Sequence, residues 1–134
     1  MRVIRSRRLG ATLADPANFT GRVWRTSFLD PPDDHSLAGL RMSYDPGARS
    51  HWHVHDQEQV IVAVFGTGLV CWEGLDAPAL LDTGDWWHVT PGVPHWHGAT
   101  PHGPFAHLAI TAGGGTRWLA EVDDADFLAA PQPM

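Results

Sequence analysis

Histidine is the residue type that this sequence uses most unusually. The chain of 134 residues contains nine histidines, as many as its arginines, and no lysine. Three histidines alternate with other residues between His51 and His55, and two more alternate in the segment His95-Trp96-His97. Because a β-strand sends alternate side chains to one face, all five rings could point into one interior. Neutral imidazole is the commonest protein ligand for metals near pH 7, so the pattern indicates a metal site.

The alternative is that each histidine is an ordinary core residue with a hydrogen-bonded ring. One buried histidine fits that interpretation well. Five rings of the same parity on two strands fit it poorly, because burying so many titratable groups without a common partner costs free energy. The role of His51 stays open between a residue of the rim, a residue that contacts the ligands and a substitute ligand.

Several side chains could move protons or orient a substrate beside such a site. His97 and His107 share the inward parity, and an imidazole near its ordinary pKa can act as a general base. Tyr44 and Ser50 lie just before the alternating histidines that begin at His51, where their hydroxyls could orient a substrate oxygen. A hydroxyl bonded to the backbone is the alternative for both. The candidate catalytic residues are His97, His107, Tyr44 and Ser50.

Short strands must carry these residues, because the sequence has little helical periodicity. Fourteen glycines and eleven prolines divide the chain into segments that are β-branched, aromatic or alternating. The tripeptide Gly66-Thr67-Gly68 predicts a tight hairpin turn. Strands are predicted at residues 23–28, 37–44, 50–55, 59–65, 69–73, 86–90, 95–99 and 105–112.

The length and the strand pattern together predict one all-β domain. A chain of 134 residues has the size of a single typical domain. We expect a sandwich or barrel over residues 21–112, an N-terminal arm at 1–20 and a C-terminal tail at 113–134. The acidic segment at 121–127 predicts a short helix within that tail.

The charge balance argues against nucleic-acid and membrane partners. The formal net charge is −6, whereas such partners require a concentrated positive field. Four arginines lie among the first eight residues, but no apolar run of signal-peptide length follows them. The single cysteine, Cys71, excludes an intramolecular disulfide and a cysteine-rich zinc site. We therefore expect a soluble, cytoplasmic protein whose partner is a small molecule.

Two segments around the histidines resemble the signature motifs of the cupin family. The first is Gly47-(x)5-His53-x-His55-(x)3-Gln59-(x)6-Gly66, with glutamine where most cupins have glutamate. The second is Gly84-(x)5-Thr90-Pro91-Gly92-(x)2-His95, with threonine where proline is usual. The resemblance implies a single-domain cupin fold, a double-stranded β-helix or jelly-roll barrel that holds one metal ion in its mouth.

The register of the first motif implies which residues bind the metal. If His51 and His53 were the paired ligands and Glu58 the third, one residue too many would separate Glu58 from Gly66, the glycine that ends the motif. In addition, the Glu58 side chain would point to the opposite face of the strand from the histidines. Taking the next pair of histidines with Gln59 satisfies both conditions, although Gln59 as an ordinary strand residue is the alternative. The ligands implied by the resemblance are His53, His55, Gln59 and His95.

Within the cupins, the chain is similar to the small bacterial manganese-dependent hydroxynitrile lyases over most of its length. The similarity implies one divalent transition metal per chain, manganese before iron, zinc or nickel, and a homodimer or higher homo-oligomer. It also places Tyr44, Ser50, His97 and His107 at positions that line the active site. Tyr44 stands where phenylalanine is usual in those enzymes, and Thr111 where glutamine is expected.

A ligand set without a carboxylate favours Lewis-acid chemistry over oxygen activation. Neutral ligands leave a divalent ion its full charge, whereas non-haem iron oxygenases commonly use two histidines and one carboxylate. We expect a metal-dependent lyase that acts on a small aromatic molecule, with His97 or His107 moving a proton. An aromatic polyketide cyclase, a dioxygenase and a non-catalytic ligand-binding cupin are the alternatives. Five tryptophans in or between the motifs suit an aromatic substrate: Trp52, Trp72, Trp86, Trp87 and Trp96.

Overall fold

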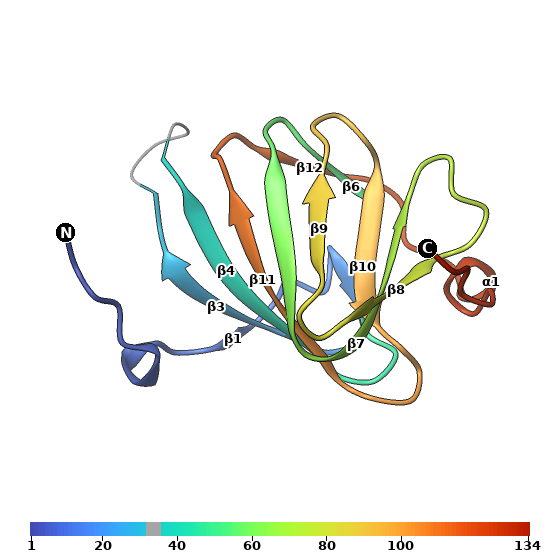
Figure 1. Cartoon of the computed structure of the whole chain (residues 1–134), viewed down its shortest axis with the longest axis horizontal. Helices are drawn as coiled ribbons and strands as arrows, with labels where there is room; N and C mark the ends of the chain where they lie inside the picture. The colour runs from blue at the N-terminus through green and yellow to red at the C-terminus, as the bar shows by residue number, and fades with distance from the viewer. Residues whose placement is uncertain (32–35) are drawn as a thin grey trace.

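Strand β7 (Gln59–Trp72) joins the two sheets of this protein. In the computed structural model, which describes residues 1–31 and 36–134, its first half pairs with β11 (Phe105–Thr111) and β9 (Trp86–Val89). Its second half pairs with β10 (His95–Ala99) and β8 (Ala79–Asp82). All these pairings are antiparallel, and the sheet curls around an open interior (Figure 1).

Shorter strands extend both sheets away from β7. One sheet continues from β11 through β4 and β3 to β1, and the other continues from β10 through β5 to β2. In the second sheet β6 also pairs with β10, and β12 pairs with β6. The remaining elements are η1 (Ser6–Arg8), β1 (Thr12–Leu13), β2 (Phe19–Thr20), β3 (Val23–Leu29), β4 (Ala38–Tyr44), β5 (Arg49–Ser50), β6 (His53–His55), β12 (Thr116–Trp118) and α1 (Asp124–Phe127).

The strand register decides which side chains face the interior. Residues that are directly opposite on neighbouring strands present their side chains on the same face of the sheet. On β3, β4 and β11, Val23 lies opposite Tyr44 and Tyr44 lies opposite Phe105, and all three are buried. The neighbouring row across the same sheet contains Thr12, Arg25, Met42, His107 and Ala63.

Apolar packing forms two clusters, one on each side of the joined sheets. The larger cluster fills the interior and includes Tyr44, Ile61 and Phe105. The smaller cluster lies under the C-terminal segment and contains Trp96 and Phe127. The predicted all-β fold with a short C-terminal helix is therefore confirmed, although the helix covers only Asp124–Phe127 of the predicted segment.

The predicted hairpin at Gly66-Thr67-Gly68 is wrong, because β7 runs straight through it. A side chain at Gly68 would meet the ring of Phe105, with its Cβ about 2.5 Å from the nearest ring carbon. Gly66 has a positive φ of 70°, and the register between β7 and β11 shifts just before it, between Ala63 and Phe65. Both glycines thus serve close packing and a local irregularity inside one long strand.

The predicted strand at 50–55 is interrupted. The backbone N–H of His51 donates to the carbonyl of Asn18, and that of Trp52 donates to the carbonyl of Ala120, so β5 and β6 are separate elements. The sheet also extends past the predicted limits of 21–112, since β1 and β2 precede them and β12 follows them. The arm and the tail therefore contribute walls to the interior.

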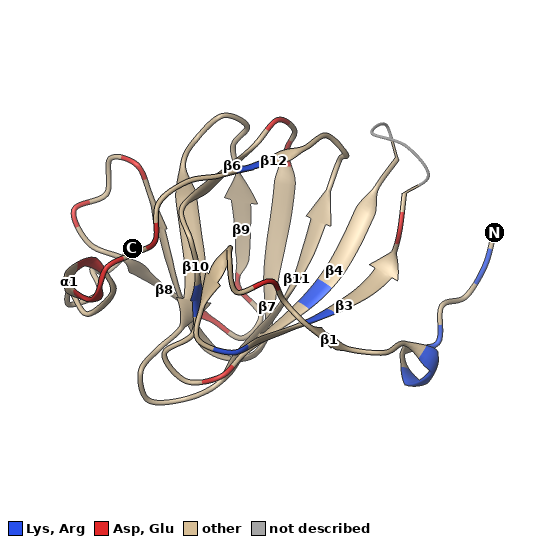
Figure 2. Cartoon of the chain, turned by 180° about the vertical axis from the view of Figure 1, so that it is seen from behind, with Lys and Arg blue, Asp and Glu red and all other residues tan. Residues whose placement is uncertain are grey.

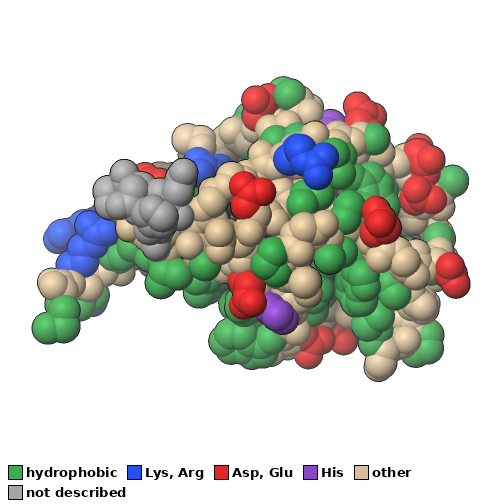
Figure 3. Space-filling model, turned by 90° about the horizontal axis from the view of Figure 1, so that it is seen from above, with side chains coloured by type: hydrophobic (Ala, Val, Ile, Leu, Met, Phe, Trp, Pro, Cys, Tyr) green, Lys and Arg blue, Asp and Glu red, His purple; other side chains and the backbone are tan. Residues whose placement is uncertain are grey.

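Charged side chains are distributed unevenly over the surface. Figure 2 shows basic residues around η1 in the N-terminal arm and acidic residues around α1. On the face seen in Figure 3, acidic side chains are scattered and basic side chains form no continuous patch. Within the part of the chain that the structure describes, no helix is long and apolar enough to span a membrane.

Candidate metal centre

The sheet brings the predicted metal ligands together from three strands. His53 on β6 lies directly opposite His95 on β10, and their ring centroids are 4.2 Å apart. The ring of His55 is 5.0 Å from that of His53 and 5.2 Å from that of His95. Gln59 begins β7 beside them and is buried with all three histidines. The four predicted ligands therefore converge.

Each of these rings has one nitrogen held by a hydrogen bond. Nδ1 of His53 lies 2.9 Å from the carbonyl oxygen of His51, and Nδ1 of His95 lies 2.9 Å from the carbonyl oxygen of Val93. Those contacts require a proton on Nδ1, because a carbonyl can only accept. Nδ1 of His55 lies 3.1 Å from the hydroxyl of Thr116. Metal-binding histidines are typically oriented in this way, with Nε2 left as the ligand atom.

Three of the predicted ligands offer buried atoms that are free to bind a metal. Nε2 of His55, Nε2 of His95 and Oε1 of Gln59 are buried and have no hydrogen-bond partner among the described residues. The amide nitrogen of Gln59 donates to the hydroxyl of Thr111 at 3.0 Å, which turns the amide oxygen the other way. Buried polar atoms without partners are costly, so a cation that accepts their lone pairs fits this site.

A second combination of three histidines also has metal-binding geometry. One ring nitrogen from each of His53, His95 and His97 lies within 4.8 Å of the other two. His97 therefore competes with His55 for the third position. Nδ1 of His97 is held by the hydroxyl of Tyr44 at 2.6 Å, as Nδ1 of His55 is held by the hydroxyl of Thr116 at 3.1 Å, so the hydrogen bonds do not choose between the two rings. The set with His55 and Gln59 remains our prediction.

Burial keeps these rings neutral. It lowers the pKa of His53 well below its ordinary value, and the neighbouring His95 lowers it further. Burial likewise lowers the pKa of His95 to about 4. The pKa of His55 is lowered by burial, with the Asp56 carboxylate and the Gln59 amide opposing that effect. Neutral rings have a free lone pair at pH 7, as metal binding requires.

A buried tyrosine connects the two predicted general bases. The Tyr44 hydroxyl lies 2.6 Å from Nδ1 of His97 and 3.0 Å from Nε2 of His107. Burial raises the pKa of Tyr44 well above its ordinary value, so the hydroxyl keeps its proton. One O–H can donate to only one ring, and the other ring must donate its N–H to the phenol oxygen. Of the two ring nitrogens that contact the Tyr44 hydroxyl, one therefore carries a lone pair and the other carries a hydrogen.

The remaining candidates surround the histidines without lining the cavity. The Ser50 hydroxyl accepts a hydrogen bond from the backbone N–H of His97 at 3.1 Å, as the backbone alternative for Ser50 predicts. Tyr44 and Ser50 are not among the described residues that line the cavity. His51 contributes its carbonyl oxygen to the ring of His53. Glu58 is an exposed rim residue whose carboxylate lies 3.4 Å from Nε2 of His88.

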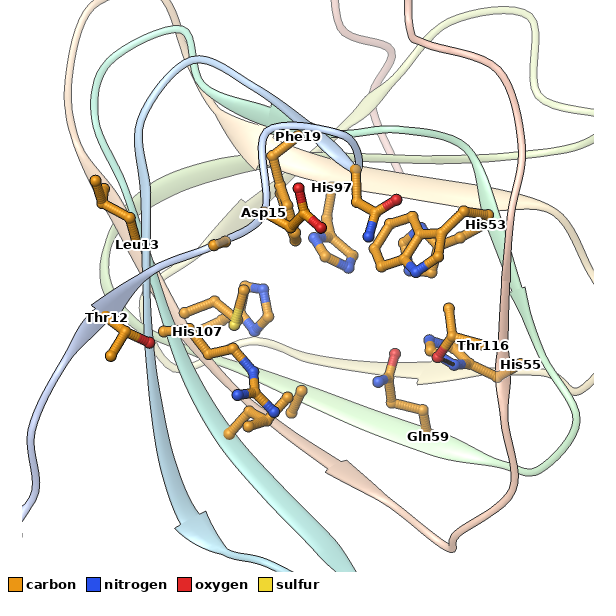
Figure 4. A pocket seen from close by; sticks show the side chains of 17 residues that line it. Thr12, Leu13, Asp15, Phe19, His53, His55, Gln59, His97, His107 and Thr116 are labelled. Carbon is orange, nitrogen blue, oxygen red and sulfur yellow. Dashed lines mark hydrogen bonds between the residues drawn. The ribbon is translucent and has the colours of Figure 1, made fainter.

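A cavity of about 350 Å³ is lined by three of the four predicted ligands, whereas the fourth, His95, lines a separate hollow with Trp72 and Trp87. His53, His55, Gln59, His97 and His107 line the cavity, and Figure 4 shows their side chains directed toward its centre. Sequence reasoning did not predict a second group of lining residues, which come from β1, the loop between β1 and β2, β2 itself, β3 and β12: Thr12, Asp15, Asn18, Phe19, Arg25, Thr116 and Trp118. Most of them lie in segments that had been interpreted as an arm and a tail, where no strand signal was strong enough to place them.

The tryptophans divide between the site and the rest of the molecule. Trp87 lies 5.5 Å from the ring of His95 and stacks on Trp72 at 5.9 Å. Trp96 is in the smaller apolar cluster, and Trp86 is exposed. Trp118, on β12, lines the cavity with its ring 4.8 Å from that of His53. Of the tryptophans near the site, Trp72 and Trp87 were therefore among those that the motifs suggested, whereas Trp118 was not.

Comparison with known families agrees with this geometry. A family model described as the cupin domain matches residues 40–111, which contain all four predicted ligands. This chain is a cupin. It is 35% identical over 112 residues to an (R)-mandelonitrile lyase from Granulicella tundricola, covering 81% of this chain and 85% of that protein. The cupin prediction made from the two motifs is therefore confirmed.

Solved structures show the same fold. A cupin-like protein from Thermotoga maritima has a TM-score of 0.83 with 28% identity, covering 92% of this chain and 95% of that one. The polyketide cyclase RemF from Streptomyces resistomycificus has a TM-score of 0.77 with 15% identity, covering 92% of this chain and 89% of its own. At that identity the second likeness concerns the fold alone.

Proposed function

We propose that this cupin is a metal-dependent lyase that breaks or forms the carbon–carbon bond of an aromatic cyanohydrin. The observation that carries the proposal is the relation to a mandelonitrile lyase over most of the chain. The histidine and glutamine site supports it, because it offers only neutral ligands. A divalent metal held by His53, His55, Gln59 and His95 supplies Lewis acidity toward a substrate oxygen.

Cyanohydrin cleavage needs one proton removed and one delivered. The hydroxyl proton must leave as the carbonyl forms, and the departing cyanide must gain a proton. His97 and His107 both line the cavity, and Tyr44 joins them at 2.6 Å and 3.0 Å. Because one ring donates to Tyr44 and the other accepts from it, a neutral pair holds both a proton acceptor and a proton donor. When the ring that donates to Tyr44 takes the hydroxyl proton on its outer nitrogen, it gives its inner proton to the Tyr44 oxygen. Tyr44 then gives its own proton to the other ring, and that ring releases its outer proton to cyanide, so the two rings exchange roles.

The remaining walls exclude water and hold the ring of the substrate. Phe19, Leu40, Met42 and Trp118 line the cavity around the histidines. Its volume of about 350 Å³ is at the lower end of the range for small-molecule sites, which suits a compound with one aromatic ring. We expect that ring against Trp118 and the oxygen of the substrate toward Gln59.

The test is anaerobic cleavage of racemic mandelonitrile by protein loaded separately with manganese, zinc and iron. We expect release of benzaldehyde without oxygen, an enantiomeric excess in the remaining cyanohydrin, and a loss of at least about tenfold in His97→Ala, or roughly 1.4 kcal/mol of barrier. His88→Ala is the matched control, because His88 is exposed and paired with Glu58. Turnover that needs both iron and oxygen would assign the protein to the dioxygenases.

A further inference from the structure

Arg25 places a positive charge in the wall of the cavity. It lies on β3 in the row that runs from Thr12 through Met42 to His107, so its side chain shares the inward face. The Cα positions of Arg25 and His107 are separated by two strand spacings, roughly 10 Å. A guanidinium on a long flexible stem can therefore reach a substituent of a substrate whose reacting carbon lies near His107.

Among the residues that the structure describes, the charge of Arg25 has no opposing partner. Across residues 1–31 and 36–134, no carboxylate lies within 4.0 Å of its guanidinium, whereas Arg22 and Arg49 each pair with an aspartate. Leu40, Met42 and Ala109 line the same cavity. Arg25 is itself exposed, so water screens its charge, and the apolar walls strengthen its attraction for an anion only where the bound molecule displaces that water.

Asp15 is the other charged side chain in the described lining, since the histidines are neutral. It lies on the loop between β1 and β2, beside Phe19 (Figure 4). Its Oδ1 accepts the backbone N–H of Ala17 at 2.9 Å, which holds the carboxylate to its own loop. It forms no ion pair with Arg25, so the guanidinium keeps its binding capacity.

We propose that the substrate carries a carboxylate, which Arg25 binds at the end of the cavity away from the metal ligands. A guanidinium matches a carboxylate with two parallel N–H···O bonds, and one arginine balances one such charge. The inference rests on the proposed lyase function and narrows its substrate to a carboxyl-substituted aromatic cyanohydrin. Arg25 is then a specificity-determining residue, separate from the groups that move protons.

The experiment compares two probes that differ only in the anionic group. Calorimetric titration of the metal-loaded protein with 4-(hydroxymethyl)benzoate and 4-(hydroxymethyl)benzamide measures binding without turnover. We expect the wild-type protein to bind the carboxylate at least about tenfold more tightly. In Arg25→Gln the two affinities should agree within about threefold, and Arg25→Lys should keep part of the preference because its charge lacks the planar fork.

Arg41→Gln is the matched control. Arg41 lies on the adjacent strand β4, and it lines a separate hollow with Ile4 and Phe28. The substitution changes the net charge by the same amount without touching the cavity, so the preference for the carboxylate should stay. The inference would be overturned if the wild-type protein bound the two probes with equal affinity. It would also be overturned if Arg25→Gln and Arg41→Gln lost the preference for the carboxylate to the same extent. A preference that depends on Arg25 in a protein that cleaves no cyanohydrin would overturn the lyase proposal alone.

Discussion

At the scale of single residues, the free nitrogens of His53 and His95 decide whether the protein binds a metal. Because Nδ1 of each ring is occupied by a backbone carbonyl, Nε2 is the atom that each ring can offer to a metal, and both rings belong to either combination of three histidines. We expect His53→Ala and His95→Ala to lower the metal content severely, measured by elemental analysis of purified protein. His102→Ala, at an exposed position, should keep the wild-type content. Equal metal in all variants would contradict the assignment.

The Tyr44 hydroxyl should matter for the rate more than for substrate binding. Tyr44→Phe keeps the buried ring but leaves Nδ1 of His97 and Nε2 of His107 without their partner. We expect kcat for cyanohydrin cleavage to fall about tenfold or more with KM nearly unchanged, and the protein to lose roughly 1 to 3 kcal/mol of stability. Tyr44 lies outside the cavity lining, so a large rise in KM alone would contradict its role between the histidines.

His107 should make the stability of the protein sensitive to acid. Burial lowers its folded-state pKa to about 4, against about 6.5 when unfolded. Between these values the unfolded chain binds the proton and the folded protein does not, so the free energy of unfolding rises with pH from about 4 to 6.5. With a chelator present, we expect His107→Gln to reduce that slope by about one proton, or about 1.4 kcal/mol per pH unit. Denaturant unfolding at several pH values measures it, and an unchanged slope would contradict a neutral buried His107.

At the scale of elements, strand alternation was enough to predict which histidines converge. The segment 95–99 is the strand β10 itself, and His53 faces His95 as the two motifs implied. The prediction of a turn at residues 66–68 was wrong because glycine is needed both in a tight turn and where a strand packs closely against a ring such as that of Phe105. Two-residue strands such as β1 and β2 carry too little pattern to be recognised. They form through long-range pairing with β3 and β5, and for this reason Thr12 and Phe19 were missed as lining residues.

Gly98 on β10 should control the position of the whole histidine strand. It lies opposite Arg49 on β5, and a Cβ there would lie 2.5 Å from the carbonyl oxygen of Ala48 and 2.6 Å from the Cβ of Arg49. Backbone cannot move aside cheaply, so we expect Gly98→Ala to cost about 1 to 3 kcal/mol and to lower metal content by displacing the neighbouring histidines. Gly103→Ala, where nothing lies within 4 Å of the added carbon, should leave both unchanged. Urea unfolding and elemental analysis test the pair.

At the scale of the whole molecule, Arg49 fastens the C-terminal segment to the sheet. Its guanidinium donates to the carbonyl of Val122 at 2.9 Å and 3.2 Å and to Asp124 at 2.8 Å, and it lies 4.2 Å from the ring centroid of Phe127. The Arg49 side chain is only 8% exposed whereas that of Asp124 is 85% exposed, so solvent screens the ion pair. The buried bonds to Val122 and the contact with the ring contribute most of the stability.

We therefore expect Arg49→Met to lower the free energy of unfolding by about 2 to 4 kcal/mol. For a domain of this size the loss corresponds to a fall in Tm of about 10 °C. Arg22→Met removes an arginine whose pair with Asp45 is 3.6 Å long and exposed on both sides, so it should cost less than about 1 kcal/mol. Thermal unfolding of the two variants distinguishes the loss of buried contacts from the loss of positive charge. Similar losses of Tm would mean that lost positive charge, and not the buried contacts of Arg49, determines the stability, since both substitutions change the net charge equally.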